Sequence, residues 1–105
     1  MAPRSVHPLP PGSTIGIMGG GQLGRMTALA AARLGYKSHI FSPEDDSPGI
    51  QVSAAATIAD YQDRTALQSF AEAVDVVTFE FENVPADSAE FLAQHALVRP
   101  GPQCL

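Results

Sequence analysis

The sequence predicts an α/β fold in which an open parallel sheet is covered by helices on both faces, giving three layers. Short apolar segments with β-branched residues alternate with segments of helical periodicity along the chain. A glycine-rich stretch, residues 19–24, separates the first apolar segment from the first helical one. Parallel strands need helical crossovers between them, so this alternation favours a parallel sheet over an antiparallel one.

The first half of the domain is predicted to be a strand, a helix and a second strand. Residues 14–18 form a short apolar run suited to a strand buried on both faces. A helix is expected from residue 23 to residue 34, followed by Gly35 in a left-handed C-terminal cap. Residues 36–41 are expected to form the second strand. Helical spacing places four apolar side chains of the helix on one face, Leu23, Met26, Ala30 and Leu34.

The second half is predicted to continue the alternation. After a polar loop over residues 42–49, a short strand is expected at residues 56–58. Asp63 is expected to cap the next helix through a free amide of its first turn. The apolar face of that helix is predicted to consist of Leu67, Phe70, Ala71 and Val74.

The last part of the chain is predicted to add a strand, a helix and a final strand. Residues 75–81 suit the third main strand, and Pro85 suits the first turn of a helix, where its missing N–H costs nothing. Ala89, Leu92 and Ala93 are expected to face inward from this helix. A fourth main strand is expected to start at residues 97–98 and to stop at Pro100.

Composition excludes several classes of protein. The chain has 105 residues, a net charge of -5 and 16% charged residues, so it lacks the basic character of a nucleic-acid-binding surface. No run of about 20 apolar residues is present, so no membrane-spanning helix is expected. The proline-rich residues 1–13 are expected to form a flexible tail, with one domain over residues 14–105. Because the tail has no apolar signal region and Cys104 has no partner cysteine, a cytoplasmic location is expected.

The glycine-rich stretch fits the pattern G-x-G-x-x-G through Gly19, Gly21 and Gly24. Directly after a strand and before a helix, this pattern is typical of a Rossmann-like phosphate-binding turn, where free amides and the helix dipole favour an anion. A dinucleotide site would also want an acid at the end of the second strand, but Ser42 stands there and the nearest acid is Glu44. A tight turn without a ligand and a ligand-binding loop are equally compatible with the pattern alone.

A second group of polar residues follows the third main strand. Glu80, Glu82 and Asn83 would lie at the carboxyl edge of the sheet, where ligands bind in open α/β folds. Alternation along the strand sends the two carboxylates to the same side. They suit hydroxyl or amine groups better than a phosphate. The alternative is that one acid caps the following helix and the other is solvated.

These segments together resemble the N-terminal domain of the N5-carboxyaminoimidazole ribonucleotide synthetase (PurK) family, whose members are ATP-grasp enzymes of purine biosynthesis. The resemblance is strongest in Gly-Gly-Gly-Gln-Leu-Gly-Arg-Met at residues 19–26 and Glu-Phe-Glu-Asn-Val-Pro at residues 80–85. It extends through residues 30–36, 59–61 and 98–100. One departure is Ser42, where relatives often carry aspartate.

The resemblance implies a pre-ATP-grasp domain of an ATP-dependent ligase, the ATPase subunit of phosphoribosylaminoimidazole carboxylase. Such enzymes use ATP, Mg²⁺ and bicarbonate to carboxylate the exocyclic amine of 5-aminoimidazole ribonucleotide, with carboxyphosphate as intermediate and ADP and phosphate as products. The ATP and Mg²⁺ ligands are expected in two further lobes that this chain lacks, so the chain alone is expected to bind neither and to be inactive. A homodimer is expected for the full-length protein.

The resemblance also implies a set of substrate-binding residues. Gly21, Gln22 and Leu23 are expected to lie against the ribonucleotide and Glu80 to contact it, with Glu82 and Asn83 as further candidates. No catalytic residue and no metal ligand are expected within this chain. The alternative function is a free-standing nicotinamide-dinucleotide-binding module, against which the missing acid at position 42 weighs.

Overall fold

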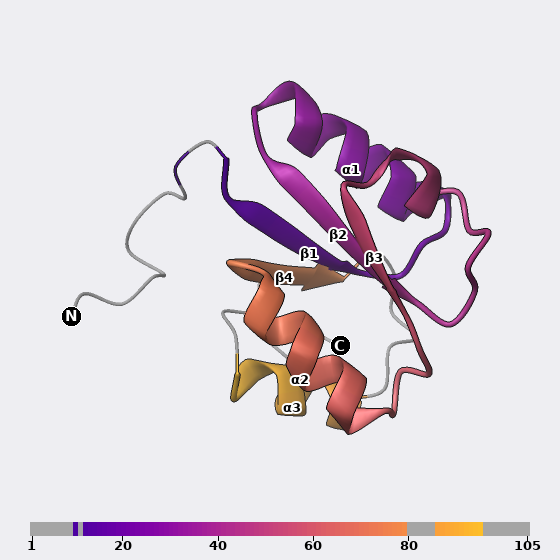
Figure 1. Cartoon of the computed structure of the whole chain (residues 1–105), viewed down its shortest axis with the longest axis vertical. Helices are drawn as coiled ribbons and strands as arrows, with labels where there is room; N and C mark the ends of the chain where they lie inside the picture. Colours follow the sequence, from indigo (N-terminus) through magenta and orange to yellow (C-terminus); the bar gives the residue numbers. More distant parts are fainter. Residues whose placement is uncertain (1–9, 11, 80–85, 96–105) are drawn as a thin grey trace.

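The computed structural model describes Pro10, residues 12–79 and residues 86–95, and these form a four-stranded sheet with helices on both faces. The strands lie in the order β3-β2-β1-β4, and each neighbouring pair is parallel. Figure 1 shows α1 on one face of the sheet and α2 with α3 on the other. The predicted three-layer α/β fold is therefore confirmed. The elements are β1 (Thr14–Met18), α1 (Gln22–Arg33), β2 (Lys37–Ser42), the 3-10 helix η2 (Ile50–Val52), β3 (Ala55–Ile58), α2 (Arg64–Ala73), β4 (Val76–Phe79) and α3 (Ala86–Ala93).

The predicted element bounds agree with the structure to within about two residues where both can be compared. The described part of the third main strand is β4, while the end of that predicted strand, Pro85 and the predicted strand at residues 97–98 lie outside the described residues. The 3-10 helix η2 was not predicted, because three residues are too few to show a periodic pattern. No helix in the described ranges is long and apolar enough to cross a membrane.

The ends of α1 and α2 follow from single residues. At the end of α1, Gly35 has φ 88°, its amide donates to the Ala32 carbonyl and the Tyr36 amide donates to the Ala31 carbonyl. This is the pair of bonds of a Schellman cap, so the predicted left-handed cap is confirmed. At the start of α2, the Asp63 carboxylate accepts from the Ala66 amide at 3.1 Å, which confirms the predicted cap.

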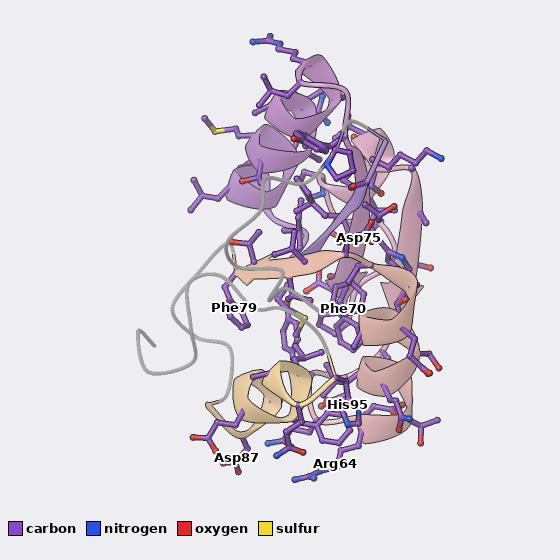
Figure 2. All side chains as sticks on the ribbon, turned by 90° about the vertical axis from the view of Figure 1, so that its left-hand side faces the viewer. Arg64, Phe70, Asp75, Phe79, Asp87 and His95 are labelled. Atoms are coloured by element: carbon purple, nitrogen blue, oxygen red, sulfur yellow. The ribbon has the colours of Figure 1, made fainter. Side chains whose placement is uncertain are left out.

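The face of the sheet under α2 and α3 holds a large core. All four side chains predicted for the apolar face of α2 are buried, and Phe70 packs edge-on against Phe41 with ring centroids 5.3 Å apart. Figure 2 shows Phe70 and Phe79 in the layer between the sheet and these helices. Leu92 of α3 is fully buried as predicted, but Ala93 is exposed, which corrects its expected inward position. This cluster consists of Met18, Phe41, Leu67, Phe70, Ala71, Val74, Val77 and Leu92.

The face under α1 is different. Among the described residues, its buried cluster consists of Ile17, Ala28 and Ile40. The buried residues of α1 are small: Gly24, Ala28 and Ala31. The four apolar side chains expected to share one face of α1 are all exposed, by 58% at Leu23, 63% at Met26 and 69% at Leu34, with Ala30 exposed as well. The apolar face read from helical spacing is therefore not the side of α1 that packs on the sheet.

Candidate functional site

The glycine-rich loop joins β1 to α1 at the carboxyl edge of the sheet. Gly19 has φ 114°, a conformation that side chains rarely adopt, and its amide donates to the Phe41 carbonyl at 2.9 Å. Gly20 is buried, and a Cβ added to it would lie 2.9 Å from Cβ of Ser47, so this position excludes a side chain by lack of space. The two glycines therefore turn the chain tightly at this edge of the sheet.

The N-terminus of α1 opens from this loop. Gly21 is the N-cap residue, with extended backbone angles of φ -71° and ψ -166°, and its carbonyl accepts from the Arg25 amide at 2.9 Å. Glycine has no side chain that could accept from the first-turn amides, so the helix's own N-cap residue does not occupy this helix end. The contrast with α2, whose first turn is capped by Asp63, marks this helix end as the one suited to a ligand.

A pocket of about 340 Å³ lies beside this helix end. Gly21 is the one predicted site residue in its lining. Gln22 and Leu23 are exposed at the start of α1, adjacent to the pocket but outside its lining. Glu80, Glu82 and Asn83 lie outside the described residues. The lining consists of Gly20, Gly21, Ser42, Pro43, Glu44, Ser47 and Tyr61.

The described lining residues combine apolar surface with hydroxyl groups, and Glu44 is the charged residue among them. Glu44 is exposed at the rim, and Asp45 and Asp46 follow it along the chain. The Ser42 hydroxyl accepts from the Glu44 amide at 3.2 Å and from the Ser47 hydroxyl at 3.4 Å. With no cation among the described lining residues, the pocket suits neutral groups that donate hydrogen bonds, such as ribose hydroxyls or an amine.

Ser42, Ser47 and Tyr61 were not among the predicted site residues. They come from the end of β2, the loop after it and the segment after β3, and the sheet order brings them to the glycine loop. A usable indication was present, because ligands in open α/β sheets contact the residues that directly follow the central strands. That rule points to Ser42, but no spacing pattern points to Ser47 or Tyr61.

His39 is half-buried on β2. Burial lowers the pKa of its imidazole below the ordinary value of 6.5. Its Nε2 lies 2.7 Å from Oγ1 of Thr57, and its ring packs edge-on against Phe70. His39 does not line the pocket, so its role is to pack β2 and β3 against α2.

A smaller pocket of about 120 Å³ lies between α2 and α3. Its lining includes Gln62, Asp87 and Ser88, and the Arg64 guanidinium lies 5.1 Å from the centre of the Phe91 ring. Figure 2 shows Arg64 and Asp87 at the outer end of these two helices. None of the predicted substrate-binding residues lines this pocket, and it lies across the sheet from α1 (Figure 1). The pocket at the glycine loop is therefore the better candidate.

The described residues do not fit a metal ion. Within residues 12–79 and 86–95, no group of three or more His, Cys, Asp or Glu side chains is placed to hold one. An Mg²⁺ ion of the kind that the resemblance implies would need ligands from outside this part of the chain.

The sequence matches a known family model and known proteins. Residues 12–105 match the family model of the ribonucleotide synthetase preATP-grasp domain. The chain is 55% identical over 97 residues to N5-carboxyaminoimidazole ribonucleotide synthase of Brucella melitensis, covering 92% of this chain and 27% of that protein.

Solved structures show the same likeness. An ADP complex of PurK, an N5-carboxyaminoimidazole ribonucleotide synthetase, superposes with a TM-score of 0.88 at 48% identity, covering 91% of this chain and 26% of that one. The Aspergillus clavatus synthase in complex with ADP and 5-aminoimidazole ribonucleotide gives 0.78 at 34% identity, covering 88% and 25%. The chain thus spans about a quarter of the length of these relatives.

Proposed function

The chain belongs to the ribonucleotide synthetase preATP-grasp family, and on that premise we propose that it forms part of the 5-aminoimidazole ribonucleotide site of an ATP-dependent carboxylase of purine biosynthesis. The observation that carries the proposal is the pocket at the uncapped end of α1, bounded by the glycine-rich loop. The full-length enzyme joins bicarbonate to the exocyclic amine of the ribonucleotide, and ATP is consumed to ADP and phosphate.

In this proposal the domain binds and orients the ribonucleotide and performs no bond-making step. The backbone at Gly21, Gln22 and Leu23 lies against the substrate, because the first turn of α1 is exposed there without a capping side chain. Glu80 accepts hydrogen bonds from substrate hydroxyl or amine groups, and Glu82 and Asn83 are further candidates. The acidic rim of the pocket supports contact with the neutral part of the ribonucleotide, so its phosphate is bound elsewhere.

ATP and Mg²⁺ belong to the rest of the enzyme in this proposal. An ADP complex and a complex of ADP with the ribonucleotide are known for relatives. When bound, ATP supplies the phosphoryl group that activates bicarbonate. We place the ATP and Mg²⁺ ligands in the further lobes of the full-length enzyme, and within residues 12–79 and 86–95 no group of three or more His, Cys, Asp or Glu side chains could hold a metal ion. We also expect the full-length protein to be a homodimer, which sedimentation would measure.

The test is steady-state kinetics of a full-length protein that carries this domain. Release of phosphate should require both bicarbonate and 5-aminoimidazole ribonucleotide. Glu80→Gln should lower the catalytic efficiency for the ribonucleotide roughly tenfold to hundredfold, the loss of about 1.5–3 kcal/mol expected for a bond to a charged group. The apparent affinity for ATP should stay nearly unchanged.

Glu72→Gln is the matched control, because Glu72 is exposed on α2 and far from the pocket lining. This variant should leave the catalytic efficiency for the ribonucleotide and the apparent affinity for ATP at the wild-type values. Normal kinetics with a lowered melting temperature in Glu80→Gln would instead assign this carboxylate to helix capping. Saturable binding of NADH at micromolar concentration would favour the dinucleotide-binding alternative.

A further inference from the structure

The loop between β2 and β3, residues 43–54, packs against the glycine-rich loop. The Gly49 amide donates to the Gly20 carbonyl at 2.7 Å. A Cβ on Gly49 would lie 3.2 Å from that same carbonyl oxygen, so the two backbones are in close contact. The glycine-rich loop is thus bonded on both sides, by Phe41 at Gly19 and by Gly49 at Gly20.

Ser47 fills the space beside Gly20. Its side chain is 8% exposed, and its hydroxyl donates to the Glu44 carbonyl at 3.1 Å. The same hydroxyl lies 3.4 Å from that of Ser42. These bonds fix the side chain of Ser47 against Gly20, which has no room for a Cβ.

The far end of this loop is attached to α1. Ile50 and Val52 pack against the cluster of Ile17, Ala28 and Ile40. On the surface, the Arg25 guanidinium donates to Oε1 of Gln51 at 3.1 Å. The β2–β3 loop therefore contacts both the glycine-rich loop and the helix that begins from it, which is the arrangement needed to fix one relative to the other.

We propose that Ser47 is a positioning residue, which holds Gly20 so that the start of α1 is presented to the ribonucleotide. This inference rests on the proposed function. Nothing in the pattern of the sequence assigns a role to Ser47. Its effect is on the fraction of molecules whose loop is ready to bind, and the apparent affinity for a ligand falls in proportion to that fraction.

The first test is Ser47→Ala in the full-length enzyme. Loss of one hydrogen bond should raise KM for 5-aminoimidazole ribonucleotide roughly threefold to tenfold. KM for ATP should stay unchanged, and so should kcat at saturation with both substrates. The backbone amide resonances of Gly19, Gly20 and Gly49 should shift in the NMR spectrum.

Ser53→Ala is the matched control. Its hydroxyl donates to the Ile50 carbonyl at 3.1 Å in the same β2–β3 loop, but Ser53 does not line the pocket. This variant should leave KM for the ribonucleotide at the wild-type value. An equal rise of KM in both variants, or no rise in Ser47→Ala, would overturn the positioning role.

A compensating pair of substitutions tests the contact without relying on Ser47→Ala to fold. Gly20→Ala should raise KM for the ribonucleotide, because the new methyl group would meet Ser47 at 2.9 Å. Adding Ser47→Gly removes that obstruction, so the double variant should bind the ribonucleotide better than Gly20→Ala alone. If the two effects simply add, the contact does not position the loop.

The failure of this inference and of the proposed function are distinguishable. A wild-type enzyme with no ribonucleotide-dependent release of phosphate would overturn the function. A wild-type enzyme that has this activity, with additive effects of the two substitutions, would overturn only the role of Ser47.

Discussion

The two faces of the sheet bury side chains of different size. The face under α2 and α3 contains a continuous core with two fully buried phenylalanines, Phe41 and Phe70. The face under α1 buries three residues in its cluster and is closed by alanine and glycine. Among the described residues, most of the large buried side chains therefore lie on the side of the sheet under α2 and α3.

The helix ends show the same division. The first turn of α2 is capped by the side chain of Asp63, whereas α1 begins at Gly21, which offers no side chain for a cap. A capping side chain would stabilise α1, but it would also occupy the position that the proposed ligand needs.

The largest effect is expected from Phe70→Ala. This fully buried ring contacts both Phe41 and His39, and its removal should lower the free energy of unfolding by about 3–5 kcal/mol. Urea unfolding of the domain followed by circular dichroism measures this loss. A loss below about 1 kcal/mol would contradict the view that this face supplies most of the stability.

A smaller effect is expected from Asp63→Ala at the start of α2. Loss of the bond from the Ala66 amide should cost about 1 kcal/mol of unfolding free energy. Glu72→Ala, at an exposed position of the same helix, is the control and should change stability by less than about 0.5 kcal/mol. Equal losses in both variants would show that the cap does not contribute.

The stability of the domain is expected to depend on pH through the half-buried His39, and this effect should be smaller than that of Asp63→Ala. Because burial lowers its pKa in the folded state, the unfolded chain takes up a proton first as pH falls through 6.5. The contribution of His39 to stability is therefore fully present above pH 6.5 and is lost as pH falls toward the folded-state pKa. His39→Gln, which can keep a hydrogen bond to Thr57, should flatten this part of the stability profile measured by urea unfolding. An unchanged profile would assign the dependence to other groups.

The smallest effect is expected from Met26→Gln on the exposed side of α1. The side chain is 63% exposed, so the free energy of unfolding should change by less than about 0.5 kcal/mol. A loss above about 2 kcal/mol, as for a buried methionine, would mean that this side of α1 is buried and would remove the contrast between the two sides.

Most of the fold could be predicted from the sequence because its determinants are local. The apolar strands, Asp63 as a cap and Gly35 as a terminator each act within a few residues, and all three are confirmed. The buried side of α1 could not be predicted in the same way. Helical spacing groups the larger apolar side chains of Leu23 and Met26 on one face, but the buried residues of α1 are Gly24, Ala28 and Ala31. Which side of a helix packs on the sheet depends on the tertiary structure and not on the local pattern alone.

The candidate site was predicted only in part for a related reason. Gly21 could be found because the glycine pattern is contiguous, and it does line the pocket. Ser47 and Tyr61 reach the pocket through the order of the strands, which places segments distant in sequence at one edge. The proposed contributions of Glu80, Glu82 and Asn83 stay predictions.

The strand order also has a consequence for how the chain is made. β1 leaves the ribosome before β4, but the two strands lie side by side in the sheet, so that Ile15 pairs with Val76. Across the same junction, the Thr14 amide donates to the Asp75 carboxylate over 61 positions of sequence. Until that later segment emerges, one edge of β1 has unpaired amides and carbonyls, which can pair with other chains. A nascent chain halted before residue 75 is therefore exposed to aggregation, whereas one that has passed β4 can pair this edge of β1 within its own sheet.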